Sequence, residues 1–171
     1  LRRLFFEADV NYRVHSGNWL RVYIHDGTSE YLIKEYSPDS GTGNQFSDFE
    51  HLDIVVTGYR SATNTIIIEY EDIGEFGWYG AFDNVHVWTE GEGENILTET
   101  FDECTLPDGW TTNIATGEDD WQFGTPNNGQ TMNGSCFAYF DDDAIGQQQP
   151  FSLVELNTPY FDGTQFKHLL M

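Results

Sequence analysis

Short segments in which apolar and polar residues alternate recur along the chain, and this period of two restricts the fold more than any other feature. In residues 18–26, Leu20, Val22 and Ile24 occupy one side of an extended chain and polar side chains occupy the other. Side chains of a strand point alternately to the two faces of a sheet, so the pattern is typical of a half-buried strand. It predicts further strands at residues 4–13, 52–59, 65–70, 81–89, 95–101, 135–140 and 151–156.

Clusters of Gly, Pro, Asn and Asp separate these segments, at residues 26–27, 38–43, 89–93, 117–120 and 126–129. Such residues supply the positive φ angles or the side-chain hydrogen bonds that turns require. No segment has a convincing helical pattern, and 171 residues fit one domain with a substantial core. The sequence therefore predicts an all-β fold, a two-sheet antiparallel jelly-roll sandwich.

The order of the segments is unusual for one module. Residues 77–88 have the pattern of a last strand, whereas residues 99–110 have that of a first strand and its turn, and the chain begins and ends inside apolar runs. We expect residues 1–89 to be the C-terminal half of a jelly-roll module and residues 95–171 to be the N-terminal half of the next, or the same, module. The intervening residues 90–94, Glu-Gly-Glu-Gly-Glu, are expected to form an acidic linker between repeats or a loop within a permuted domain.

The chain is strongly acidic, with 29 Asp and Glu against 7 Lys and Arg and a formal net charge of -22. Nucleic acids and anionic membranes need a basic surface, so neither is an expected partner. No apolar run is long enough to cross a bilayer, and no membrane insertion is expected. An aromatic content of 16% indicates a folded protein whose surface carries the acidity.

The two cysteines, Cys104 and Cys136, are both in the second half of the chain. An even pair usually forms a disulfide in an extracellular protein, and two buried free thiols are the alternative. A zinc site is not expected, because neither cysteine has a second Cys or a His at ligand spacing.

Several short motifs carry a family resemblance once the two halves are reordered. They are Phe101-Asp102-Glu103, Leu106-Pro107-Asp108-Gly109-Trp110, Asp119-Asp120-Trp121, Leu156-Asn157-Thr158-Pro159 and Phe82-Asp83-Asn84-Val85. In that order the chain resembles the bacterial cleaved-adhesin, or choice-of-anchor J, modules. These are MAM-like jelly rolls of Bacteroidetes surface proteins, including the adhesin regions of gingipains. The resemblance implies a concanavalin-like or galactose-binding-like sandwich, secretion, display on the cell surface and structural calcium.

The residues themselves also predict a calcium site. Calcium binds six to eight hard oxygen ligands, and the first and last strands of a jelly roll lie side by side. Asp102 and Asp83 would then approach each other, and close carboxylates repel unless a cation or a proton lies between them. We expect Asp83 and Asp102 to bind calcium together with Asp141, Asp142 or Glu103. The alternative is that these are solvated acids of loops.

A catalytic reading rests on Glu69 and Glu71, which lie on one face of a predicted strand, and on Glu75 after it. Concanavalin-like glycosidases carry paired acids on one strand in a similar way. Residues 72–74 form a turn, however, so an exposed acidic strand end is the favoured interpretation. No nucleophile elbow, no phosphate loop and no His-x-x-x-His pair occurs. We therefore expect no enzyme and no catalytic residues.

Aromatic residues offer a binding surface instead. Trp78 and Tyr79 lie between glycines, where we expect them to stack on a sugar ring, whereas Trp88, Trp110 and Trp121 are expected in the core. The function expected first is a calcium-stabilised repeat of a secreted, cell-surface adhesin or filament. Its expected partners are neighbouring copies and host or matrix glycans or proteins. A carbohydrate-binding module of a secreted hydrolase is the alternative, and a concanavalin-like glycosidase is the second.

Overall fold

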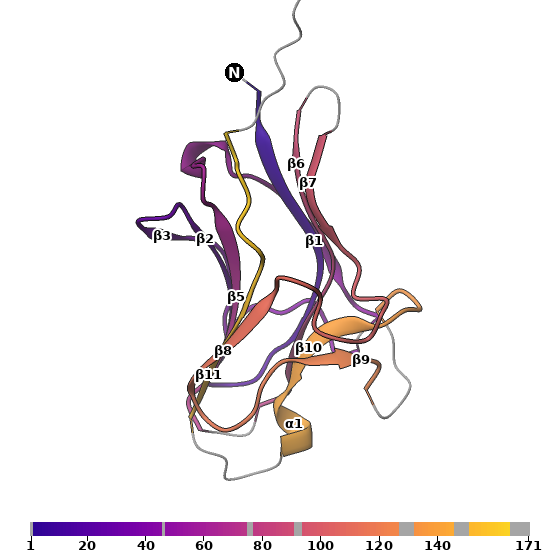
Figure 1. Ribbon diagram of the computed structural model, residues 1–171. Helices are drawn as coiled ribbons and strands as arrows, with labels where there is room; N and C mark the ends of the chain where they lie inside the picture. Colours follow the sequence, from indigo (N-terminus) through magenta and orange to yellow (C-terminus); the bar gives the residue numbers. More distant parts are fainter. Residues whose placement is uncertain are drawn as a thin grey trace, which may run out of the picture.

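The computed structural model describes residues 2–45, 47–74, 77–90, 94–126, 132–145 and 151–164. In this part of the chain, two antiparallel sheets pack face to face as a β-sandwich (Figure 1). The predicted all-β sandwich class is confirmed, and the arrangement is consistent with a jelly roll. Sheet A consists of β1 (Leu4–Arg13), β4 (Glu50–Val55), β6 (Tyr79–Thr89), β7 (Glu94–Glu99), β9 (Gln122–Gly124) and β10 (Phe137–Asp141).

Sheet B is five-stranded, in the order β3-β2-β5-β11-β8. Its strands are β2 (Asn18–His25), β3 (Glu30–Tyr36), β5 (Thr65–Asp72), β8 (Thr111–Thr116) and β11 (Ser152–Asn157). A single 3-10 turn, η1 (Thr57–Tyr59), follows β4, and a single helical turn, α1 (Asp142–Ile145), follows β10. The segment predicted as one strand at residues 52–59 is thus a strand that ends at Val55 and then a turn.

The core lies between the inner faces of the two sheets. In β2 the burial alternates along the strand, as the period of two predicts, and Leu20, Val22 and Ile24 are buried. Across the core, the ring of Tyr70 in sheet B lies 4.7 Å, centroid to centroid, from that of Phe140 in sheet A. Aromatic pairs at such distances add to the stability that burial itself provides.

Two of the three tryptophans predicted in the core are found there, and the third is not. Trp110 and Trp121 are buried in the core, as expected. Trp88 is half-buried and stacks on the Phe5 ring with the centroids 4.3 Å apart, while its indole N–H donates to Glu7. Trp88 therefore does not fill the core as we expected. In the alternating strand β6, the buried Val87 takes the inward position beside it.

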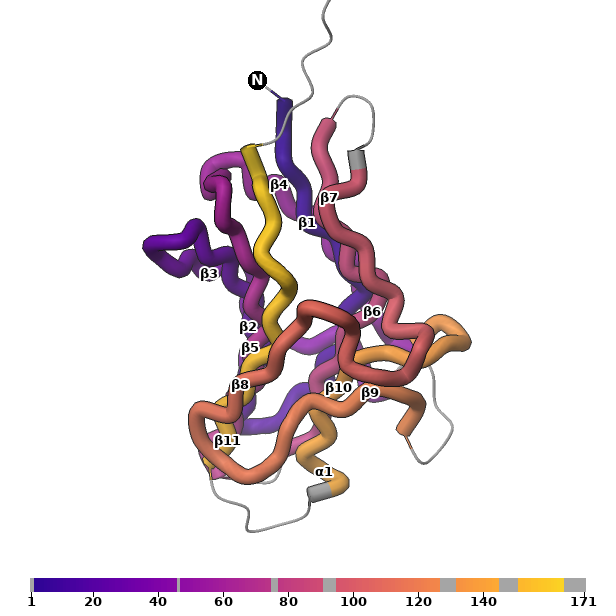
Figure 2. The backbone as a smooth tube through the Cα atoms, in the orientation of Figure 1, coloured from indigo at the N-terminus to yellow at the C-terminus, as the bar shows by residue number. Residues whose placement is uncertain are grey.

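Both halves of the chain contribute strands to both sheets (Figure 2). In sheet A, β6 pairs with β10 near its start and with β7 near its end. In sheet B, β5 pairs with β11, and β11 pairs with β8. Residues 1–89 and 95–171 thus share two sheets wherever they are described. The apolar run in which the chain ends, at residues 166–171, lies outside the described residues.

Candidate functional site

Asp83 occupies a bulged position in β6. The pairing of β1 with β6 shifts between Glu7 and Asp9, and the next residue, Asn84, has a φ of 50°. Asp83 is fully buried, and its Oδ1 accepts a bond of 2.8 Å from the Asn84 N–H. Its Oδ2 is buried with no hydrogen-bond partner among the described residues. Native structures seldom leave a buried polar atom in that state, so this oxygen calls for an explanation.

Negative charge surrounds this carboxylate. Asp9 is the register partner of Asp83 in β1, and Asp102 lies close enough to act on it electrostatically. Burial, together with the charges of Asp9 and Asp102, raises the pKa of Asp83 to about 6, although the Asn84 N–H bond and the nearby side chain of Asn133 act in the opposite direction. The folded protein therefore holds a carboxylate where its charge is unfavourable unless a proton or a cation compensates it.

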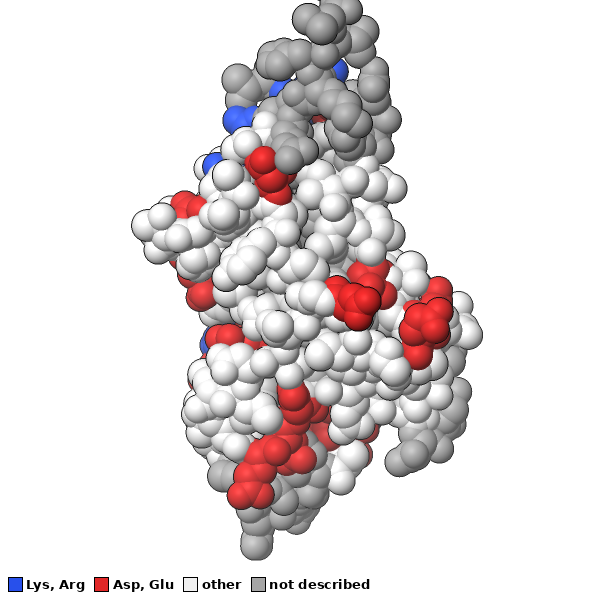
Figure 3. Space-filling model, in the orientation of Figure 1, with Lys and Arg blue, Asp and Glu red and all other residues white. Residues whose placement is uncertain are grey.

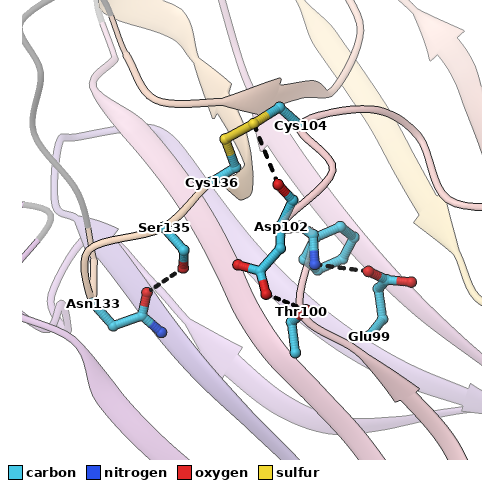
Figure 4. The surroundings of a disulfide bond; sticks show 8 residues. Glu99, Thr100, Asp102, Cys104, Asn133, Ser135 and Cys136 are labelled. Atoms are coloured by element: carbon cyan, nitrogen blue, oxygen red, sulfur yellow. Dashed lines mark hydrogen bonds between the residues drawn. A yellow bond between two sulfur atoms is a disulfide. The ribbon is translucent and has the colours of Figure 1, made fainter.

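Asp102 is in the turn that follows β7, whereas we expected it on a strand (Figure 4). Its Oδ2 accepts a bond of 2.8 Å from the Thr100 hydroxyl, and the Phe101 N–H donates to Glu99. Phe101 has a φ of 52° and its ring is buried against Trp110. The turn is thus held by local hydrogen bonds and by an aromatic anchor, and its backbone has a conformation that few non-glycine residues adopt.

A disulfide between Cys104 and Cys136 fixes the other side of this turn, with the two Cα atoms 5.3 Å apart. Cys136 directly precedes β10, the neighbour of β6, so the bond ties the Asp102 turn to the strand beside Asp83. The nearby segment before Cys136 includes Asn133, whose Oδ1 accepts a bond of 2.7 Å from the Ser135 hydroxyl (Figure 4). The pair of cysteines therefore forms part of the frame of this site.

Asp9 is a member of the cluster that the sequence analysis missed. Its Oδ2 accepts a bond of 2.7 Å from Asn84 Nδ2, and its Oδ1 lies 2.8 Å from His51 Nδ1. Residues 4–13 had been predicted as an alternating strand, which places Asp9 on the polar side with Glu7. Within the described ranges, no three His, Cys, Asp or Glu side chains form a group that could hold a metal ion. Amide, backbone or water oxygens would have to complete any coordination here.

The structure does not bring all the predicted calcium ligands together. Glu103 lies in the same turn as Asp102 and is exposed. Asp141 pairs with Tyr79, four positions before Asp83 in β6. At about 3.3 Å per residue, this places Asp141 roughly 13 Å along the strand. Asp142 follows it and bonds instead to the Gly77 N–H at 2.6 Å. The predicted ligands therefore fall into two groups at different places.

The outer face of sheet B carries the carboxylates that a catalytic reading would use. The guanidinium of Arg21 lies 2.9 Å from a carboxylate oxygen of Glu35 and of Glu69, and it also contacts Glu71. Glu69 and Glu71 do share one face, but both contact the same guanidinium. Glu75 lies outside the described residues.

A groove of about 640 Å³ lies over part of this face. Its floor comes from side chains of β2, β5, β8 and β11, and its wall from residues that follow β11: His25, Thr65, Ile67, Gly109, Thr111, Asn113, Glu155, Asn157, Thr158, Pro159 and Tyr160. Tyr160 is 79% exposed. Sequence analysis did not predict the groove, because the residues that line it come mainly from four strands that are far apart along the chain.

Trp78 and Tyr79 do not form the open platform that we expected. Tyr79 is only 5% exposed and packs with Ala81, Met132 and Phe137 on the outer side of sheet A. The guanidinium carbon of Arg13 lies 3.3 Å from the centre of the Trp78 ring. Tyr79 is thus covered by neighbouring side chains, and Arg13 lies over one face of the half-buried Trp78.

Figure 3 shows acidic side chains in several separate groups on one face, whereas the few basic ones visible are near the N-terminal end. No helix of the described residues is long and apolar enough to cross a membrane. A scan against protein-family models and searches among curated proteins and solved structures gave no match to this chain.

Proposed function

We propose that this chain is a non-catalytic adhesion module of a secreted, cell-surface protein, stabilised by calcium. The observation that carries the proposal is the Asp83 carboxylate, which is buried, has an oxygen without a partner and faces the charges of Asp9 and Asp102. Calcium is suited to such a place, because it binds carboxylate and amide oxygens in flexible geometry. Asp83 and Asp102 are the residues that we expect to hold it.

The surroundings of this cluster support a structural ion in an extracellular protein. Disulfides persist in oxidising compartments, and here the Cys104–Cys136 bond restrains the turn that carries Asp102. A cation at this place would join the start of the second half of the chain to β6 of the first. It would also relieve part of the repulsion within a chain whose formal net charge is -22.

A binding role is favoured over catalysis by the ion pairs of Arg21. A retaining glycosidase needs one carboxylate as nucleophile and another as proton donor. Glu69 and Glu71 both contact the same guanidinium, which holds them as a charged structural pair. We propose neighbouring copies of the module and glycans or proteins of a host or matrix as partners. Light scattering over a range of concentrations tests self-association, and a strictly monomeric protein at high concentration contradicts it.

Chelation tests the calcium proposal. In EDTA at low ionic strength, the melting temperature is expected to fall by about 5–10 °C, since an ion bound only to the folded state stabilises it by mass action. Added salt recovers part of the loss by screening repulsion. Asp83→Asn is expected to reduce the calcium-dependent shift, whereas Asp39→Asn, which removes the same charge from an exposed loop, retains all of it. An identical melting curve with and without EDTA contradicts the proposal.

A carbohydrate-binding module is the second candidate, and the groove on sheet B favours it. An exposed tyrosine beside Asn, Thr and Glu side chains combines a stacking surface with hydrogen-bonding groups. Because Glu155 lines the groove, we expect neutral saccharides rather than sulfated or sialylated ones. On a glycan array, Tyr160→Ala should weaken binding about three- to tenfold. Tyr31→Ala, another exposed tyrosine, should not. Equal binding by both variants argues against the groove.

A further inference from the structure

A second buried acidic cluster lies where the two sheets meet beside α1, and we call it the inter-sheet cluster: Asn18, Asp72 and Asp142. Asn18 begins β2 and Asp72 ends β5, and the two are register partners in sheet B. Asp142 follows β10 of sheet A directly. Their exposed fractions are 0%, 1% and 4%. Polar side chains from both sheets are thus buried together at one end of the sandwich.

Gly77 shows how closely these groups approach each other. Its N–H donates to Asp142 Oδ2 at 2.6 Å. A Cβ placed on Gly77 would lie 2.0 Å from Asn18 Nδ2 and 2.4 Å from Asp142 Oδ2. Any residue other than glycine would therefore displace one of the two side chains. Asp72 is also near enough to Asp142 for their charges to repel.

Asn18 supplies an observation independent of the acids. Its Nδ2 donates to the Tyr70 hydroxyl at 2.6 Å, and its backbone oxygen accepts a bond of 2.6 Å from the Tyr12 hydroxyl. Its Oδ1 is buried and has no hydrogen-bond partner among the described residues. Because buried polar atoms are nearly always satisfied, an amide oxygen left over in a cluster with two carboxylates indicates a missing donor or cation.

The described side chains do not supply that positive group to Asp142. None of the ion pairs between described residues involves Asp142, and the charges that act on it come from Asp72, Asp141 and Asp143, all acidic. A buried carboxylate in such surroundings is compensated by a bound cation or by a proton. The oxygen of Asn18 favours the cation, because a proton shared between the two acids would leave that oxygen without a partner.

We propose that a hard divalent cation, calcium by preference, binds to the inter-sheet cluster and links sheet A to sheet B. The ligands would be Asn18 Oδ1 and the carboxylates of Asp72 and Asp142, with water in the remaining positions. An all-oxygen set without His or Cys suits calcium better than zinc. This inference concerns different residues from the Asp83 cluster and does not depend on it.

The test is the number of calcium ions that the calcium-depleted protein binds, measured by equilibrium dialysis. We expect two ions for the native chain and one for Asp142→Asn. Asp83→Asn should also bind one, because it retains the inter-sheet cluster. Asp143→Asn removes the same charge from the exposed neighbour of Asp142 and should bind two. If Asp142→Asn binds as many ions as the native chain, a proton compensates the acids and the inference is overturned.

A second variant covers the case in which Asp142→Asn fails to fold. Asn18→Ala keeps both carboxylates and is expected to weaken one of two calcium sites by roughly tenfold or more. Crystals soaked in terbium should show an anomalous peak between Asn18, Asp72 and Asp142. Unchanged affinity in Asn18→Ala, or a peak at Asp83 with none between the sheets, overturns this inference. Loss of the Asp83 site alone would contradict the proposed function and leave the inter-sheet site standing.

Discussion

The two sheets carry their carboxylates under opposite conditions. On the outer face of sheet B, Glu35, Glu69 and Glu71 surround Arg21, which brings its own positive charge to the site. In sheet A, Asp83 lies beside Asp9, and no described Lys or Arg forms an ion pair with either. With 7 basic residues for 29 acidic ones, the chain cannot neutralise every cluster from within. The outer face of sheet B thus brings a cation of its own to its carboxylates, whereas the Asp83 cluster of sheet A depends on what the solution supplies.

Removal of the disulfide, which restrains the Asp83 cluster of sheet A, should have the largest effect on the free energy of unfolding. The double variant Cys104→Ser, Cys136→Ser opens a loop with a sequence separation of 32. The loop-closure relation gives a loss of about 3–4 kcal/mol in the free energy of unfolding. We also expect weaker calcium binding, because the Asp102 turn loses its tether. Urea unfolding with and without calcium measures both effects. A midpoint equal to that of the native protein would show that the disulfide is no part of the frame.

The pH dependence of the calcium-free protein should show the next largest effect. Burial raises the pKa of Asp83 from an ordinary value near 3.8 to about 6. Between these values the folded state binds a proton that the unfolded state releases, so this contribution to stability is present at pH 4 and is lost as the pH rises through 6. The loss should be about 2 kcal/mol for this group.

Asp83→Asn provides the control for that experiment. Melting in EDTA at pH 4.5 and 7 should show a larger fall for the native chain than for the variant. Saturating calcium should reduce the fall or reverse it, because the ion competes with the proton for the same carboxylate. A native protein in EDTA that becomes more stable from pH 4.5 to 7 by the same amount as Asp83→Asn would contradict the account of sheet A.

Loss of the Arg21 guanidinium from sheet B should have a smaller effect on the free energy of unfolding. Arg21→Met leaves Glu69 and Glu71 facing each other without their partner, and should cost about 1–2 kcal/mol because the site is partly exposed. A second change, Glu71→Gln, should restore part of the loss. Lys34→Met is the matched control, since Lys34 forms a single ion pair among the described residues, with Glu50 at 3.2 Å, and its loss should cost less than about 1 kcal/mol. Equal losses of stability in the two variants would mean that Arg21 stabilises its carboxylates no more than an ordinary surface ion pair does.

The fold was predictable wherever a strand has one buried face. Residues 4–13 alternate, and β1 spans Leu4–Arg13. Three strands were missed, two because little of their surface is buried and one because it is very short. β8 lies at a sheet edge and is largely exposed, β3 lies at the other edge with most of its side chains in solvent, and β9 has 3 residues. An edge strand needs no alternation, so the sequence leaves no signal for it.

The site was predictable in part, for the same kind of reason. The cysteine pair was predicted from the even number of cysteines, and the nearness of Asp83 to Asp102 from the order of strands in a jelly roll. Asp9 belongs to the cluster only because a register shift in β1 places it opposite Asp83. A register is set by the whole sheet, and no local pattern reveals it. The separation of Asp141 from Asp83 has the same origin, since only the pairing of β10 with β6 fixes it.

The position of β11 affects how the chain folds during its synthesis. This strand inserts between β5 and β8 in sheet B, although it follows both of them in the chain. Until it emerges, β5 presents a full row of backbone donors and acceptors to any other extended chain. Non-local pairing of this kind also slows folding. We therefore expect the nascent chain to need protection by chaperones until translation has passed Asn157, however stable the finished sandwich is.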